Sequence, residues 1–174
     1  LTNLEVKIMF QRMIHDWFVP VKSEYNDFVK AMFLGDVDAM NEYMNRVALQ
    51  TFSYFDTGER ASGAEPERFY HGFVLGLLVD LQGSYYVKSN RESGFGRYDV
   101  MLEPKKSGKD PAVILEFKVR STRKENSLEE TAQSALAQIK DRKYSEELKE
   151  KGIAGEQIKE YGFAFEGKNV LIVN

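Results

Sequence analysis

The sequence predicts an α/β sandwich in which residues 66–173 follow the order αβββαββ, preceded by a helical subdomain. Three observations predict this class. Three strand-like runs follow one another in the middle of the chain, helical periodicity flanks them on both sides, and two short apolar runs around an "EGK" turn come last. The five strand-like runs are 84–89, 96–102, 112–119, 161–165 and 169–173.

The N-terminal part of the chain is expected to be helical. Apolar residues recur at helical spacing over residues 3–18, 23–34 and 37–55. One side of each helix is rich in Met and aromatic residues, which is typical of a helix-packing surface. We therefore expect a small helical subdomain here.

A connector separates this subdomain from the sandwich. The stretch "TGERASGAEPE" at 57–67 has the small, polar, Gly- and Pro-containing composition of a linker. We therefore predict one domain over 1–60 and a second over 61–174. The second begins with a helix over 66–82, and a long helix over about 127–149 follows its third strand.

Composition excludes several classes of protein. The 174 residues are 43% hydrophobic, enough to bury a core, and the net charge of −3 excludes a global polycation. The chain has no cysteine, so disulfides, thiolate metal sites and cysteine nucleophiles are excluded. No apolar run approaches the roughly 20 residues of a membrane span, and we expect a cytoplasmic protein. Because residue 1 is Leu, we expect the chain to be part of a longer protein.

Charge is unevenly distributed. Residues 103–124 contain seven Lys or Arg against three acidic residues, a surplus of four positive charges, so the remainder carries seven negative ones. Three of these basic residues, Arg120, Arg123 and Lys124, directly follow the third strand. They could receive a phosphate backbone, and a solvated turn is an equally good interpretation.

The second and third strands carry charge at their centres although each has a wholly apolar face. If they form a hairpin with its midpoint between residues 107 and 108, Asp99 lies opposite Glu116. The same register pairs apolar residues on the core face. Those pairs are Tyr98 with Phe117, Val100 with Leu115 and Leu102 with Val113.

Two carboxylates placed opposite one another on a sheet predict a metal site. Such like charges repel, so they share a proton or hold a cation, and hard oxygen ligands favour Mg²⁺ or Mn²⁺. Lys118 lies on the same strand face as Glu116, where its ammonium could position a water or stabilise developing negative charge. The competing interpretation is a solvated face on which Lys118 pairs with one carboxylate.

At this point the chain resembles a known family. The segments "FYHGFVLGLL", "GFGRYDVML", "AVILEFKV" and "ALAQIKDRKY" are similar to those of the PD-(D/E)xK nuclease superfamily. The similarity is greatest to the nuclease-like C-terminal domain of bacterial AAA-ATPase-like proteins. It implies a restriction-endonuclease-like fold with a mixed central sheet over about 66–173, and a missing N-terminal ATPase-like domain. Tyr98 stands where the Pro of the family motif would be.

The resemblance implies a role for each matching residue. Asp99 and Glu116 would be the metal carboxylates, with the Phe117 carbonyl as a further ligand and Lys118 as the catalytic lysine. Glu67, or less well Glu65, would add an acidic group near the metal, and Gln138 would reach the site from the long helix. These residues follow the family motif one by one in the sequence.

Two of the candidate residues also have local interpretations. His71 lies four positions after Glu67 on one helix, where it could contact nucleic acid or bond to a nearby backbone group. Gln138 lies within the apolar stripe of its helix, where an unpartnered amide would be costly, so we expect it to have a polar partner.

The sequence therefore predicts a Mg²⁺- or Mn²⁺-dependent nuclease, with DNA favoured over RNA as the substrate. One alternative is a catalytically silent nuclease fold that binds nucleic acid or protein, which the acidic net charge favours. Another is that the helical part is a homodimer surface. No membrane association is expected.

Overall fold

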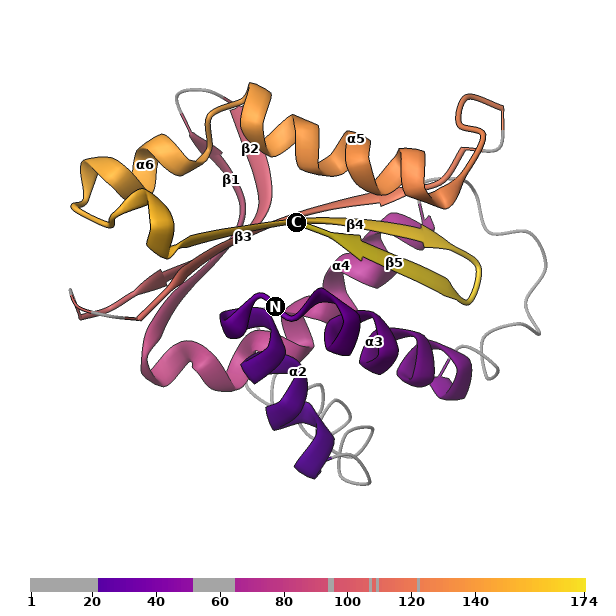
Figure 1. The fold of residues 1–174 in the computed structure, drawn as a ribbon, viewed down its shortest axis with the longest axis horizontal. Helices are drawn as coiled ribbons and strands as arrows, with labels where there is room; N and C mark the ends of the chain where they lie inside the picture. The colour runs from indigo at the N-terminus through magenta and orange to yellow at the C-terminus, as the bar shows by residue number, and fades with distance from the viewer. Residues whose placement is uncertain (1–21, 52–64, 94–95, 107, 109, 122) are drawn as a thin grey trace, which may run out of the picture.

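The structure, a computed structural model, describes residues 22–51, 65–93, 96–106, 108, 110–121 and 123–174. The helix expected over 3–18 lies outside these residues, as does the connector up to residue 64. A five-stranded sheet in the order β1-β2-β3-β4-β5 forms the central layer, with helices on both faces (Figure 1). The predicted α/β class is confirmed.

The described elements follow the expected order. In chain order they are α2 (Lys22–Leu34), α3 (Val37–Thr51), α4 (Glu65–Leu78), the 3-10 helix η3 (Val79–Gly83), β1 (Tyr85–Ser93), β2 (Gly96–Pro104), β3 (Ala112–Val119), α5 (Leu128–Asp141), α6 (Ser145–Glu150), the 3-10 helix η4 (Gly155–Gln157), β4 (Ile158–Glu166) and β5 (Asn169–Val173). Only the β3–β4 pair is parallel, because α5 and α6 form the crossover between these strands; the other neighbours are antiparallel.

Two apolar layers hold the sheet between helices. The larger layer packs α2, α3 and α4 against one face, and the smaller packs α5 and α6 against the other. Because both faces are covered, residues 112–117 of β3 are all buried. Any charged side chain in this stretch, Glu116 included, therefore lies in the interior.

Helix α3 closes one edge of the sheet. The Asn41 amide accepts a hydrogen bond from the Ile172 backbone N–H (2.8 Å) and donates one to the Ile172 carbonyl (2.9 Å). Asn45, one helical turn later, makes the same pair of bonds with Val170 at 2.9 and 2.8 Å. The two amides satisfy outward-facing backbone groups of β5, as a sixth strand would.

Helix α2 is tied to the sheet as well. The buried Tyr161 hydroxyl of β4 donates to the Met32 carbonyl in the last turn of α2, where the helix itself offers no partner. Burial raises the pKa of Tyr161 to about 12. The described helices of the predicted first domain thus share a core with the second. The predicted boundary at residues 60 and 61 lies outside the described residues and stays a prediction.

The long helix predicted over 127–149 is wrong in one respect: it is two helices. The helix is interrupted between α5 and α6, where Lys143 adopts a left-handed conformation (φ 51°). This turn directs Tyr144 into the smaller apolar layer, where 1% of its surface is exposed. Tyr144 is buried whether the segment is one helix or two, so the apolar pattern of the sequence does not reveal the break. None of the described helices has the length and apolar character needed to cross a bilayer.

Candidate active site

The strand register places the two central carboxylates at the point where β2 and β3 part. The pairs Val100–Leu115 and Leu102–Val113 confirm the predicted register in this part of the hairpin, whereas the predicted pairs Tyr98–Phe117 and Asp99–Glu116 are not part of the ladder. Val100–Leu115 is the last pair of this ladder in that direction. Asp99 and Glu116, the next residues on each strand, therefore lie where the strands begin to diverge.

Asp99 is held against the main chain of β3. Its Oδ2 accepts a hydrogen bond from the backbone N–H of Phe117 at 2.8 Å, which takes the place of a strand-to-strand bond. The N–H and C=O of one strand residue point to the same side, so the Phe117 carbonyl also points toward β2. The Asp99 carboxylate and the Phe117 carbonyl are thus on the same side of β3, next to Glu116.

Glu116 is buried, with 4% of its surface exposed. Its Oε1 accepts a hydrogen bond from Nε2 of Gln138 on α5. Moving a carboxylate out of water is costly, and this donor offsets part of the cost. The expectation that Gln138 has a polar partner is confirmed.

Helix α5 also orients Lys118. The Lys118 ammonium donates to the Ser134 hydroxyl at 2.9 Å. Ser134 and Gln138 are one helical turn apart, and Lys118 and Glu116 are two residues apart on one face of β3. One face of α5 therefore fixes both the lysine and the buried carboxylate. Sequence reasoning missed Ser134, although a polar residue four positions before Gln138 is a visible signal.

Gly162 of β4 lets α5 approach this closely. It is the ladder partner of Glu116, and a Cβ atom at this position would lie 2.3 Å from the Ala132 carbonyl oxygen and 2.6 Å from the Leu136 nitrogen. Any larger residue would push the helix away from the sheet. The sequence carries no local sign of this role.

Tyr144 is a further neighbour of the site, which the sequence analysis did not include. Burial raises its pKa, and the nearby Glu116 and Asp99 carboxylates add to this effect. A hydrogen bond with Gln138 acts in the opposite direction. Gln138 therefore connects the tyrosine with the buried glutamate.

Of the candidate site residues on α4, the structure describes the side chain of His71 but not those of Glu65 and Glu67. Glu65 and Glu67 lie in the first turn of α4, and their side chains are outside the described residues. The His71 ring is on the opposite side of the sheet from Glu116, 5.6 Å from the Phe117 ring, and its Nε2 is 2.8 Å from the Ser89 hydroxyl. A direct contact of His71 with nucleic acid stays a prediction.

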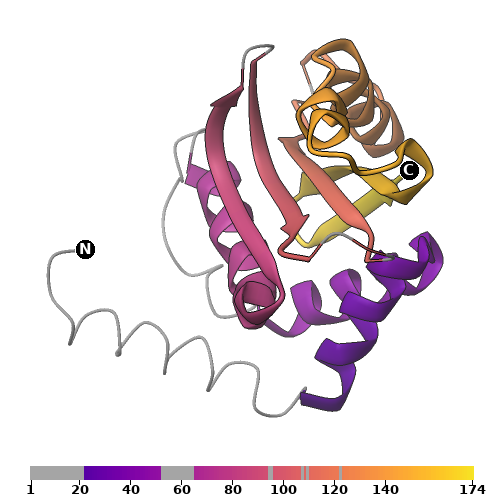
Figure 2. The same ribbon diagram turned by 90° about the vertical axis from the view of Figure 1, so that its left-hand side faces the viewer.

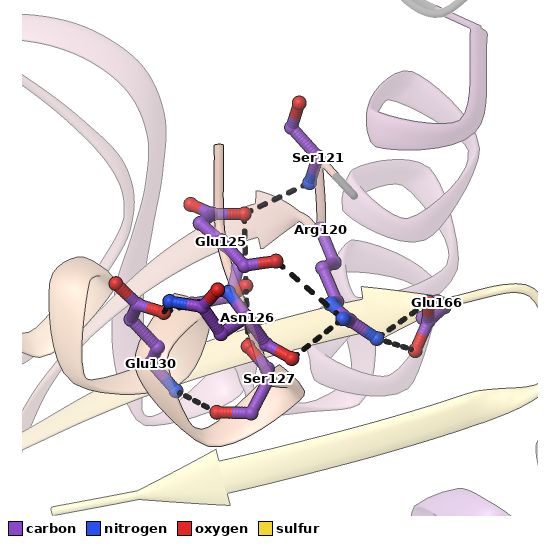
Figure 3. Close-up of polar contacts among 8 residues, drawn as sticks. Arg120, Ser121, Glu125, Asn126, Ser127, Glu130 and Glu166 are labelled. Carbon is purple, nitrogen blue, oxygen red and sulfur yellow. Dashed lines mark hydrogen bonds and ion pairs between the residues drawn. The ribbon is translucent and has the colours of Figure 1, made fainter. Parts of the chain in front are cut away.

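Arg120, predicted either to receive a phosphate backbone or to lie in a solvated turn, has several bonding partners within the chain, and its contact with nucleic acid stays a prediction. Its guanidinium makes two bonds of 2.8 Å to Glu166 and also donates to the Glu125 and Asn126 carbonyls (Figure 3). These bonds use Arg120 to hold the loop between β3 and α5. Arg123 and Lys124 of the same loop are exposed.

The loop is completed by its own acidic residue and by the cap of α5. The Glu125 carboxylate accepts bonds from the Ser121 N–H at 2.8 Å and the Thr131 hydroxyl at 2.9 Å. The Ser127 hydroxyl caps α5 by accepting from the Glu130 N–H at 3.1 Å (Figure 3). The start of α5, and with it Ser134, is thereby fixed relative to the end of β3.

The donor set fits a hard divalent cation. Asp99, Glu116 and the Phe117 carbonyl are oxygen donors, the type that Mg²⁺ and Mn²⁺ prefer, and Mg²⁺ is commonly held by one or two carboxylates. Among the residues that the structure describes, no group of three or more His, Cys, Asp or Glu is placed to hold a metal. The described part of the site thus offers two carboxylates and a carbonyl.

The sandwich order, the diverging strands and the Asp99, Glu116 and Lys118 arrangement define a nuclease-like α/β domain. The model of the PD-(D/E)XK nuclease superfamily matches residues 65–174, and the chain belongs to this superfamily. Searches of the curated proteins and of the solved structures gave no match.

Proposed function

We propose that the chain is a metal-dependent nuclease that hydrolyses phosphodiester bonds, with DNA favoured over RNA. The observation that carries the proposal is the convergence of Asp99, Glu116 and Lys118 where β2 and β3 part. Family membership supports a nucleic-acid substrate.

Asp99, Glu116 and the Phe117 carbonyl would hold Mg²⁺ or Mn²⁺, and the Glu67 carboxylate would add to them. When bound, the cation polarises the phosphoryl group and lowers the pKa of a water molecule. The family's usual use of divalent metals agrees with this donor set. Burial of Glu116 keeps competing water from one side of the site.

Lys118 supplies a positive charge beside the reacting phosphate. Hydrolysis forms a bond from water oxygen to phosphorus, breaks one phosphorus–ester oxygen bond and transfers the water's protons to solvent and the leaving oxygen. The ammonium can orient the attacking water and stabilise the negative charge that develops on the phosphoryl oxygens. Ser134 holds the ammonium on the correct face, and Gln138 fixes the orientation of Glu116.

The proposal also includes contacts with nucleic acid next to the site and a further domain. Exposed Arg123 and Lys124 follow the site strand and would contact the phosphate backbone. The N-terminal ATPase-like domain, the homodimer surface on the helical part and the cytoplasmic location remain predictions.

The second candidate function is a nuclease fold that binds nucleic acid or protein without cleaving it. The net charge of −3 and the engagement of Arg120 within its own loop favour it. The two candidates differ in one observable, divalent-dependent cleavage.

The test offers single-stranded, double-stranded and branched DNA and RNA to the wild type and to Lys118→Ala, with Mg²⁺, Mn²⁺ or EDTA. We expect Lys118→Ala to lose cleavage by about 10²- to 10³-fold while keeping metal and nucleic-acid binding, since the lost interaction belongs to the transition state. Glu116→Ala should weaken metal binding and cleavage together. Lys140→Ala, an exposed lysine on α5, is the matched control.

Cleavage that survives EDTA, or that Lys118→Ala leaves unchanged, contradicts the proposed mechanism. Inactivity of the wild type on every substrate, with binding retained, assigns the chain to the second candidate function.

A further inference from the structure

The two edge strands of the sheet, β5 and β1, differ in what covers their outward backbone groups. At one edge, Asn41 and Asn45 satisfy the outward backbone groups of β5. At the other, β1 is the outermost strand (Figure 2), and among the described elements its extensive packing is with β2 and η3. Natural proteins normally block exposed strand edges, and within the described part of the chain no strand pairs with the outer edge of β1.

A groove with a volume of about 420 Å³ follows this edge. Five consecutive β1 residues, Tyr85–Ser89, line it together with Gln82 and Lys105. Its Ser89 end lies across the sheet from Val100, the residue next to Asp99. This end of the groove is therefore level with Asp99 along the strands, and the groove leads away from that level along β1.

An exposed aromatic ring and a lysine stand at the far end of the groove. Tyr86 is 53% exposed, and it is the one aromatic side chain among the large hydrophobic residues found exposed in the described chain. The Lys105 ammonium is 5.4 Å from the centre of its ring and is held there by a 2.6 Å bond to the Gln82 carbonyl. The ammonium thus lies over one face of this largely exposed ring, and the other face can take a flat ligand.

The charge at this end is complementary to an anion. Lys105 and Lys106 are both exposed, and they outweigh Asp110, whose carboxylate acts on the neighbouring Tyr85. Lys88 belongs to a neutral network, because Lys88 and Lys151 are matched by Glu103 and Glu147. The surplus positive charge is therefore at the Tyr86 end.

The geometry points to a single-strand binding track along β1, in which Tyr86 stacks on a base and Lys105 faces the phosphate backbone. Sequence-tolerant binding of single strands uses a positively charged groove with aromatic side chains on which bases stack, and Tyr86 with Lys105 provides one such unit. This inference rests on the proposed function for the identity of the substrate. It assigns to the substrate a single-stranded flank that leaves the active site along β1.

The length of the track sets the length of the flank. Tyr86 pairs with Glu103, four strand residues from Asp99. At about 3.3 Å per strand residue and 3.4 Å per nucleotide of one strand, this distance corresponds to on the order of four nucleotides. Shorter strands reach the acidic pair without reaching Tyr86.

The experiment measures binding in EDTA, so that it does not depend on cleavage. The probes are fluorescein-labelled oligothymidylates of about 4 to about 16 nucleotides, the range of sites in single-strand grooves. Tyr86→Ala should bind the longest probe about tenfold more weakly, the loss expected when one stacked base is no longer held. Tyr86→Phe keeps the ring and should bind like the wild type.

The charge is tested separately. Lys105→Ala should reduce the slope of log affinity against log salt by about 0.7, the contribution of one phosphate contact on a single strand. The matched control is Lys30→Ala, because this lysine is exposed on α2 and forms an ion pair of 3.6 Å with the equally exposed Asp27. It should leave both affinity and salt slope unchanged.

Equal affinities of Tyr86→Ala and the wild type at every length overturn the track, as does the absence of any oligothymidylate binding. Self-association that Tyr86→Ala abolishes, with oligonucleotide affinity unchanged, assigns the groove to a second copy and also overturns it. Binding that depends on Tyr86 in a protein inactive on every substrate supports the track and contradicts the proposed function. Cleavage that requires Lys118, with no effect of Tyr86→Ala on binding, supports the proposed function and contradicts the track.

Discussion

Gly162 pairs with Glu116 in the parallel ladder between β3 and β4, and α5 lies directly on it. The contact sets the distance between the helix that carries Ser134 and Gln138 and the strand that carries Lys118 and Glu116. A residue without chemistry of its own thereby determines the geometry of the candidate site.

Gly162→Ala should damage both stability and cleavage. The new Cβ would lie 2.3 Å from the Ala132 carbonyl, so α5 must move. Overpacking of this kind costs about 1–3 kcal/mol, and a displacement of about 1 Å in an active site can cost about 10²-fold in rate. Urea denaturation and the cleavage assay measure the two effects.

The matched control is Gly72→Ala on α4, where an added Cβ meets nothing within 4 Å. Alanine is the better helix former, so this variant should be neutral or slightly more stable. Wild-type cleavage by Gly162→Ala would show that α5 does not depend on this contact.

Ser134→Ala should reduce cleavage through Lys118 and leave folding intact. Removing the hydroxyl frees the Lys118 ammonium to leave its position, and the loss of such an orienting partner typically costs about 10- to 100-fold. Ser134→Thr keeps a hydroxyl and should restore most of the rate. The effect should fall on kcat rather than KM.

Gln133→Ala, one position earlier on the exposed side of α5, serves as the control. In the Lys118→Ala background, Ser134→Ala should have no further effect. An additive loss in the double variant would contradict the assignment of Ser134 to Lys118.

Replacement of both Asn41 and Asn45 by Ala should destabilise the protein and promote self-association. Four hydrogen bonds to the backbone of β5 are lost, each with a net value of about 0.5–1.5 kcal/mol, and the exposed edge becomes available for strand pairing. Denaturant midpoints and light scattering measure the two effects. Glu42→Ala, on the exposed side of the same helix, is the control, and a monomeric double variant of wild-type stability would refute the edge-capping role.

The network of Lys88, Glu103, Glu147 and Lys151 should make stability depend on pH. Burial alone would raise the pKa of Glu103, but bonds from Lys151 and Lys88 outweigh it and hold the pKa below its ordinary value of 4.5. A carboxylate with a lowered pKa stabilises the fold above its ordinary pKa, and this stability is lost as the pH falls through the folded-state pKa. Acid should therefore weaken the tie between α6 and the β1–β2 ribbon.

Glu103→Gln should lower the free energy of unfolding by about 1–3 kcal/mol at about pH 7, between the values of exposed and buried pairs. The difference from the wild type should shrink as the pH falls below 4.5. Glu146→Gln removes the exposed partner of Lys149 and should change stability little at either pH. A difference for Glu103→Gln that is constant over this range would contradict the linkage.

Local patterns predicted the sheet and where several of the candidate site residues lie on it. The register between β2 and β3 followed from matching apolar faces, because a shift by one residue would have exposed Val100 or Leu115. The alternation that buries Leu115 also placed Glu116 and Lys118 together on the other face. The role of Gln138 was predicted from the resemblance to the nuclease superfamily.

The parts that could not be predicted depend on tertiary contacts. The engagement of Arg120 depends on Glu166, 46 residues later, and the role of Gly162 depends on where α5 lies. The break at Lys143 was hidden because lysine rarely adopts a left-handed conformation and no Gly or Asn marks the position. None of these has a signature in its neighbouring residues.

The pairing of α3 with β5 has a consequence for synthesis on the ribosome. Asn41 and Ile172 are separated by 131 positions, so α3 leaves the ribosome long before its partner strand exists. At 5–20 residues per second this interval is roughly 7 to 26 seconds. Asp99, Glu116 and Gln138, by contrast, lie close together in the sequence, and Gly162, which positions α5 over them, follows in the next strand. During that interval the apolar side of α3 has no sheet edge to cover, so this helix is a segment of the nascent chain that a chaperone would protect.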